Sequence, residues 1–358
     1  MESALLKILL PAISSFVVGI LITPIVTHWL YKHKMWKKVA GKTAGYGDNN
    51  GTPIFNSLHK DKDVNTPRMG GIVVWVSVVV TLLLFWCFTL IWQSDFTTGL
   101  NFFSREQTLL PMFMFLVGAA VGFLDDLLTV KGRGGHFADG LSLRYRLTLV
   151  TVSLAMSGWW FYDKLEVSSI NLIGYGPIEL GLGFVLVYIF MGTCIYMSSV
   201  IDGLDGLSGG VFLFIFAAYA GISFYQGQYD ISALCASIVG ALLAFLWFNI
   251  PPARFYMGET GMMALTLLLT MVVFMTDVLG DGEGVLLLPV VGFLLVVTVG
   301  TTALQILSKK FRGKKIFLVA PLHHHFEAKG WPAYKVTMRY WILGFICAMT
   351  GLILAIAF

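Results

Sequence analysis

Five carboxylates stand at the ends of apolar runs, where a membrane protein seldom places charge. Asp125 and Asp126 close one run, Asp202 and Asp205 lie in a glycine-rich link between two others, and Glu259 precedes a fourth. A charge beside the bilayer is costly unless it has a partner or a function. Clustered carboxylates suit Mg²⁺, which proteins usually hold jointly with substrate phosphates. These acids are therefore the first candidates for catalysis or metal binding, although each alone could be only a helix cap.

The glycine-rich link at 202–206 places its two acids at helical spacing. Asp202 and Asp205 are three residues apart, so a helical continuation would point both carboxylates to one face. Gly203 and Gly206 leave that face without bulk, and a phosphate or a backbone segment could approach it closely. The spacing favours a phosphate-binding turn.

A histidine triplet and two basic segments are further candidates. Adjacent residues of a helix diverge, so one metal ion could not easily bind His323, His324 and His325 together, and phosphate or sugar binding is the alternative. Lys62 lies in a basic segment that runs to Gly70-Gly71 and could hold phosphate at a helix N-terminus. Both this segment and the basic residues at 309–315 could equally serve only to orient the membrane helices.

The composition predicts the elements that must position these residues. The 358-residue chain is 57% hydrophobic and 12% charged, with a mean hydropathy of +0.80, which excludes an ordinary soluble domain. Apolar runs near spanning length fall at 4–30, 70–92, 108–124, 145–162, 178–199, 207–224, 231–249, 262–279, 285–306 and 337–358. We therefore expect one integral-membrane domain over 1–358, all-α, with about ten transmembrane helices.

Lysine and arginine predict the orientation. Of the 24 such residues, 21 fall at 32–68, 131–146, 254 and 309–339, which are alternate loops. The positive-inside rule makes these loops cytoplasmic and both termini external, so the carboxylates and histidines would lie in a cytoplasmic active-site cleft. The net charge of +4 thus reports topology, and we expect no nucleic-acid partner.

Five motifs in this order resemble those of the polyprenyl-phosphate N-acetylhexosamine-1-phosphate transferase superfamily. They lie at 66–71 (Thr-Pro-x-Met-Gly-Gly), 122–126 (Gly-Phe-Leu-Asp-Asp), 202–207 (Asp-Gly-Leu-Asp-Gly-Leu), 257–261 (Met-Gly-x-Thr-Gly) and 320–327 (Ala-Pro-Leu-His-His-His-Phe-Glu). The resemblance runs nearly end to end. The last motif, continued by Lys329-Gly330-Trp331, is similar to the murein-specific branch.

The resemblance implies transfer of phospho-MurNAc-pentapeptide from UDP-MurNAc-pentapeptide to undecaprenyl phosphate, which yields lipid I and UMP. It implies Mg²⁺ as the cofactor, the bacterial cytoplasmic (inner) membrane as the location, and a possible homodimer. Both reactants are highly anionic, so a metal ion and basic side chains would offset their repulsion.

The resemblance also assigns roles to particular residues. Asp125 is the expected base for the lipid phosphate, with Asp126 beside it, and a covalent aspartyl intermediate is the alternative. Glu259 matches the Mg²⁺ position and Tyr256 the aromatic residue that stacks on uracil. The remaining matches are Asn249, Asp205 and Gln305 in the nucleoside pocket, Asp202, His323, His324 and His325 near the diphosphate and sugar, and Lys62 among the substrate-binding residues.

Several positions depart from the family pattern, and they cluster at the expected site. Thr129 stands where the family has Lys, Arg146 replaces Lys, and Glu259 replaces Asp. Tyr196 and Ser199 stand where the family pattern has two Asn residues. Two alternatives therefore stay open: a relative that transfers another sugar phosphate, and a non-catalytic membrane homologue.

Overall fold

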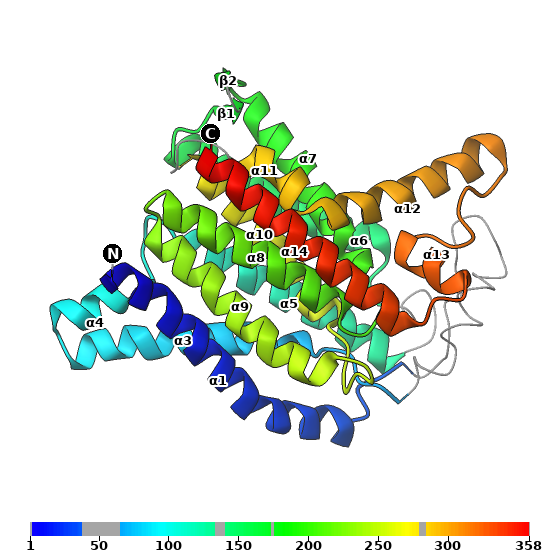
Figure 1. Cartoon of the computed structure of the whole chain (residues 1–358), viewed down its shortest axis with the longest axis horizontal. Coiled ribbons are helices and arrows are strands. Elements are labelled where there is room, and N and C mark those ends of the chain that lie inside the picture. The colour runs from blue at the N-terminus through cyan, green and yellow to red at the C-terminus, as the bar shows by residue number, and fades with distance from the viewer. Residues whose placement is uncertain (1, 38–64, 133–139, 173–174, 279–283, 358) are drawn as a thin grey trace.

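The computed structural model describes residues 2–37, 65–132, 140–172, 175–278 and 284–357, and it shows a bundle of long helices (Figure 1). Nine helices in these ranges are long and apolar enough to span a membrane. They are α1 (Glu2–Lys32), α3 (Gly71–Ile91), α5 (Leu109–Lys131), α7 (Gly183–Met197, continued by the 3₁₀ turn Ser198–Ile201), α8 (Leu207–Tyr225), α9 (Tyr229–Asn249), α10 (Gly258–Val278), α12 (Phe293–Arg312) and α14 (Ala333–Ala357). The predicted class, an all-α polytopic membrane protein, is confirmed.

Three of the ten predicted runs differ from the expectation, namely 145–162, 285–306 and 178–199. The run 145–162 forms α6 (Leu143–Lys164), which packs on α7 but is more polar than the spanning helices. The run 285–306 is two helices, because α11 (Gly284–Val291) ends at Val291 and α12 begins at Phe293, with Gly292 between them. Pro289 lacks the backbone N–H that a continuous helix needs, which agrees with a break here.

Short elements complete the described chain. They are α4 (Asp95–Leu100), α13 (Leu322–Ala328) and an antiparallel hairpin of β1 (Ser169–Leu172) and β2 (Gly176–Glu179), in which Ser169 is opposite Glu179. The run predicted from 178 therefore starts as a strand, and its helix α7 begins only at Gly183. Both chain termini lie on the side of the bundle where α4 and the hairpin are found, and α13 lies on the other side (Figure 1).

Helix α10 is the centre of the bundle. In its spanning window 94% of the residues are buried, and it packs on α3, α5, α7, α8 and α11. Contact with α5 is close, because a Cβ on Gly122 would lie 2.0 Å from the carbonyl oxygen of Glu259, and one on Gly118 would lie 2.5 Å from that of Met263. Glycines four apart let two membrane helices approach at backbone distance. This approach places the last turns of α5 beside the first turn of α10.

The membrane orientation stays a prediction, and labelling of single cysteines tests it. In a background with Cys87, Cys194, Cys235 and Cys347 replaced by Ser, cysteines are introduced at Tyr175 and Lys315, both exposed. An impermeant maleimide should label position 175 in intact cells and position 315 only after permeabilisation. Labelling of position 315 from outside would contradict a cytoplasmic site, because the nucleotide sugars that the resemblance implies as substrates are cytoplasmic.

Candidate functional site

The motif at 66–71 forms a short backbone ladder with the segment before α10. The N–H groups of Gly70 and Gly71 donate to the carbonyls of Tyr256 and Met257 at 2.8 and 2.9 Å, and the N–H of Tyr256 donates to the carbonyl of Pro67 at 2.8 Å. A Cβ on Gly70 would lie 2.7 Å from the Tyr256 carbonyl oxygen, so only glycine fits there. The ladder directs Arg68 toward the carboxylates, and it lies within electrostatic range of Asp125, Asp202 and Glu259.

Asp126 holds the first turn of α10. Its Oδ2 accepts hydrogen bonds from the backbone N–H of Thr260 at 2.9 Å and from the Thr260 hydroxyl at 2.7 Å, and the side chain is buried. Gly258 has φ +69°, and a Cβ there would lie 2.4 Å from the same carboxylate oxygen. Asp126 therefore caps a helix from a neighbouring helix. For Asp126, the structure thus shows the helix-capping role that each acid alone could have.

Asp125 has a different environment from its neighbour. Its Oδ1 accepts from the N–H of Leu141 at 2.7 Å, while its Oδ2 lies 3.8 Å from Arg146 Nη1, a loose ion pair. Thr129 is buried one turn later, where its hydroxyl donates to the Asp125 carbonyl at 2.9 Å. Gly140 packs directly on this threonine, because a Cβ on Gly140 would collide with Thr129 Oγ1.

Glu259 and Arg146 form the closest ion pair of the site. Nη1 of Arg146 lies 2.6 Å from Oε1 of Glu259 and joins α6 to α10. Oε2 of Glu259 and Nε of Arg146 are also buried, and neither has a hydrogen-bond partner among the described residues. Buried polar atoms in native proteins normally have partners, so a half-satisfied pair indicates a place where a ligand completes the bonding.

Asp202 joins the link after α7 to the same centre. Its Oδ1 accepts from the Ser208 hydroxyl at 2.7 Å and its Oδ2 from the N–H of Gly258 at 3.1 Å. Burial raises the pKa of Asp202 above its ordinary value of 3.8, although the Ser208 hydroxyl and the charge of Arg68 act in the opposite direction. Ionisation of this buried carboxylate therefore lowers the stability of the fold.

A substitution at Asp202 tests that cost. Asn can accept from Gly258 and donate to Ser208, so Asp202→Asn keeps both contacts and removes the charge. Because the folded pKa exceeds the unfolded value, ionisation destabilises the native state above about pH 4. In detergent, the melting temperature of Asp202→Asn relative to the native protein should therefore rise between pH 4 and pH 7. Asp163→Asn, at an exposed position, is the control, and a pH-independent difference would contradict the argument.

Asp205 and Asn249 stabilise the turn rather than project from it. The Asn249 amide accepts from the N–H of Gly206 at 2.9 Å and donates to the carbonyl of Phe255 at 2.7 Å, and Asp205 Oδ2 accepts from the N–H of Ala253 at 3.2 Å. Helix α14 completes the frame through Thr337, whose hydroxyl donates to the Asp205 carbonyl at 3.0 Å. These bonds occupy both polar atoms of the Asn249 side chain.

Two of the three histidines contact the same turn. His323 and His324 are buried, and a Cβ on Gly203 would lie 2.7 and 2.6 Å from their Nε2 atoms. Nδ1 of His324 lies 2.7 Å from Oε2 of Glu327 one turn later, an arrangement that orients the imidazole with Nε2 toward the turn. Only glycine at 203 permits this approach.

His325 and Gln305 lie in a second group. Nδ1 of His325 accepts from the N–H of Leu318 at 3.1 Å, and burial together with the charge of Lys329 lowers its pKa. Gln305 accepts from the N–H groups of Ile316 and Phe317, both at 3.0 Å. Both side chains hold the segment that connects α12 to α13.

The remaining predicted positions can be placed only in part. Lys62 lies outside the described residues. Tyr256 is half-buried and its backbone belongs to the ladder with Pro67. Arg68 and Arg146 are the two site residues that the sequence patterns did not predict, although Arg146 marks a departure from the family pattern. The signal for Arg68 was its place inside the Thr-Pro-x-Met-Gly-Gly motif.

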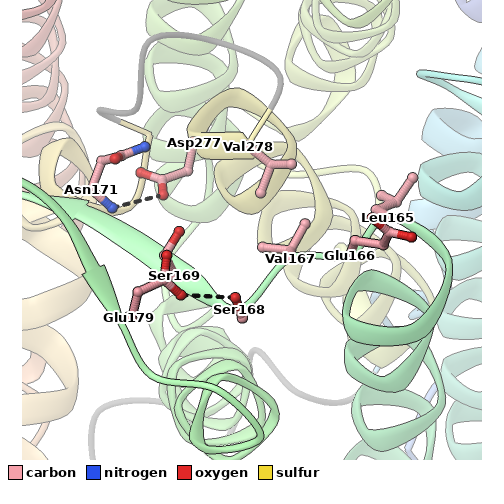
Figure 2. Close-up of a pocket in the computed structure, with 9 residues that line it drawn as sticks. All are labelled: Leu165, Glu166, Val167, Ser168, Ser169, Asn171, Glu179, Asp277 and Val278. Carbon is pink, nitrogen blue, oxygen red and sulfur yellow. Dashed lines mark hydrogen bonds between the residues drawn. The ribbon is translucent and has the colours of Figure 1, made fainter.

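A pocket of about 280 Å³ lies at the other end of α10 (Figure 2). Asp277 lies eighteen positions after Glu259 in α10, which is roughly 27 Å along the helix axis. The lining residues are Leu165, Glu166, Val167, Ser168, Ser169, Asn171, Glu179, Asp277 and Val278. This pocket is distinct from the carboxylate cluster.

Comparison with known proteins gives one consistent result. Residues 108–277 match the model of glycosyl transferase family 4. The phospho-N-acetylmuramoyl-pentapeptide-transferase of Geobacillus sp. (strain WCH70) is 31% identical over 349 residues, which are 96% of either chain. The protein of the same name from Chloroflexus aggregans is 30% identical over 98% of this chain and 90% of its own length. The chain therefore belongs to the phospho-N-acetylmuramoyl-pentapeptide-transferase family.

Proposed function

We propose that the chain transfers phospho-MurNAc-pentapeptide from its UDP conjugate to undecaprenyl phosphate in the bacterial cytoplasmic membrane. The products are lipid I and UMP, and the reaction is a step of peptidoglycan synthesis. The observation that carries the proposal is the convergence of Asp125, Asp202, Glu259 and two guanidiniums at one end of a membrane bundle. Relatives named for this reaction, at about 30% identity over nearly the whole chain, support it.

The reaction joins two anions, and the described residues suit its steps. An oxygen of the lipid phosphate attacks the phosphorus bonded to the sugar, and the bond from that phosphorus to the UMP oxygen breaks. Asp125 accepts the proton of the lipid phosphate, since its Oδ2 has only the loose contact with Arg146. Arg68 and Arg146 offset the charge of the diphosphate and of the departing UMP. The alternative is two displacements: Asp125 attacks that phosphorus and UMP departs, and the lipid phosphate then attacks the same phosphorus and breaks its bond to Asp125.

Mg²⁺ belongs to the proposal, and the residues present fit it. Among the described residues, there is no cluster of three or more His, Cys, Asp or Glu side chains that could hold a metal ion by itself. Mg²⁺ is often held by one or two carboxylates plus substrate phosphates and water, so this does not contradict a site. Oε2 of Glu259 is the open, buried oxygen that would hold it, with Asp125 nearby. When bound, the ion would neutralise charge on the transferring phosphate.

One observation favours the non-catalytic alternative. Arg146 already binds one oxygen of Glu259 at 2.6 Å, so a guanidinium offsets part of the negative charge that would attract a metal ion. The Oε2 atom of Glu259 and the Nε atom of Arg146 favour a catalytic site instead. Both are buried without a hydrogen-bond partner among the described residues, whereas the polar atoms of a purely structural pair are normally satisfied.

An assay with defined components tests the proposal. The purified chain is incubated with UDP-MurNAc-pentapeptide, undecaprenyl phosphate and Mg²⁺, and both UMP and the lipid product are measured. Omission of the lipid or of Mg²⁺ should abolish UMP release, and UDP-GlcNAc should be a poor donor. Product formed only from another UDP-sugar would favour the related transferase, and no product from any donor would favour the non-catalytic homologue.

A further inference from the structure

The C-terminal half of α12 leaves the bundle. Figure 1 shows α12 projecting away from the other helices, and its buried residues after Thr298 are Gln305 and Ser308 alone. Both contact the chain that returns from the helix, since Gln305 binds Phe317 and the Ser308 hydroxyl donates to the Lys314 carbonyl at 2.9 Å. The end of α12 and its return segment are therefore covered mainly by each other.

This projection has an apolar face and a basic end. Leu304, Leu307 and Phe311 recur at helical spacing on one face, and Phe311 is 74% exposed. Four exposed cations lie around the end of this face, namely Lys310, Arg312, Lys314 and Lys315. Residues 284–326 contain no Asp or Glu, so nothing acidic along this stretch neutralises them. An apolar helical face that ends in clustered cations is typical of a segment at the boundary between acyl chains and anionic headgroups.

We infer that the basic end of α12, residues 310–315, binds anionic phospholipid headgroups of the surrounding bilayer. Charge complementarity and continuity with the lipid-facing surface of the bundle select this occupant. The cations are spread over an open tip, which suits several bulk headgroups better than the single monophosphate of the acceptor lipid. The binding itself does not depend on the proposed transfer reaction.

The contacts of the return segment connect this surface to the site. Gln305 holds Ile316 and Phe317 through three hydrogen bonds of 3.0 Å. The next residue, Leu318, donates its N–H to His325 in α13, which also carries His324 against Gly203. Headgroup binding would therefore restrain the connection that places the histidines at the turn. This second step rests on the proposed function for its effect on rate.

The test compares the native chain with K310Q/R312Q/K314Q/K315Q. Full-length protein is placed in vesicles of phosphatidylcholine alone or with about one third phosphatidylglycerol. Native mass spectrometry after extraction counts bound phosphatidylglycerol, and hydrogen exchange reports the amides of 316–325. Each cation near an anionic surface contributes about a five-fold gain in affinity. The variant should therefore lose at least about ten-fold in affinity for phosphatidylglycerol, and protection of 316–325 by that lipid should disappear.

The control neutralises Lys32 and Arg144, which are exposed at other ends of helices, and should keep both responses. Transfer rates are measured in parallel: phosphatidylglycerol should accelerate the native chain but not the variant, with equal rates in phosphatidylcholine. Unchanged lipid binding by the variant overturns the inference. A raised KM for undecaprenyl phosphate in phosphatidylcholine vesicles also overturns it, since the tip would then collect the acceptor. An inactive native chain that still binds phosphatidylglycerol would refute only the proposed function.

Discussion

Glu259→Gln should lower the rate of transfer by about 10²–10³-fold, the usual loss when one preorganised electrostatic group is removed from an active site. The amide keeps the shape of the side chain and removes its charge. It leaves Arg146 without the carboxylate that lies 2.6 Å from it, and it removes the open Oε2 that the proposal assigns to Mg²⁺. The rate should stay low at every Mg²⁺ concentration, as measured by UMP release.

Matched variants separate metal binding from the ion pair. Glu259→Asp keeps the charge but shortens the reach by one methylene, so it should weaken the contact with Arg146 and retain far more activity than Gln. Arg146→Lys keeps the positive charge but removes the planar guanidinium, so it tests the contribution of the ion pair through its cationic partner. Glu106→Gln, an exposed carboxylate, should have no effect. Near-normal turnover in Glu259→Gln would reassign the metal to Asp125, Asp202 or Asp205.

The cost of charge beside a membrane marked these acids as candidates in the sequence, and the assignment of a catalytic site to them stays a prediction. Sequence reasoning could not distinguish their functions, because those depend on partners that are remote in sequence. Asp125 and Asp126 are adjacent, yet one binds Leu141 and faces Arg146, while the other caps α10 through Thr260. The close approach of α5 to α10 at Gly122 decides this division, and no local pattern reports which helices meet.

The fold, too, could be predicted from the sequence only in part. Hydropathy predicted the long spans from α1 to α14, because each must satisfy its backbone within one apolar helix. It joined α11 and α12 into one run, since both are apolar and only Pro289 and Gly292 mark the break. Gln305 and Asn249 were expected in a nucleoside pocket, whereas the structure shows their amides bonded to backbone. That assignment stays a prediction, and binding would have to share or displace those bonds.

Asp125→Asn should abolish transfer, with a loss of about 10²–10⁴-fold if the residue acts as a general base. Binding of the UDP-sugar should remain, because Asp205 and the turn around it belong to other segments. A control, Asp163→Asn, removes a carboxylate that is exposed at the end of α6 and should leave the rate unchanged. Binding is measured by calorimetry and transfer by UMP release on the same preparations.

The pH dependence of the Asp125→Asn variant distinguishes a general base from a covalent nucleophile at this position. A base removes a proton from the lipid phosphate, so the defect should shrink as the pH rises and the phosphate loses that proton unaided. A covalent nucleophile cannot be replaced in this way, and UMP release would stay blocked at every pH. Asp126→Ala should behave differently from both, since it removes the oxygen that accepts two hydrogen bonds from Thr260 and should lower the melting temperature as well as the rate. Asp126→Asn keeps an oxygen for those bonds and tests the charge alone. If Asp125→Asn turned over normally at neutral pH while Asp126→Asn did not, the two neighbours would have to exchange roles, and the loose contact of Asp125 with Arg146 would be structural only.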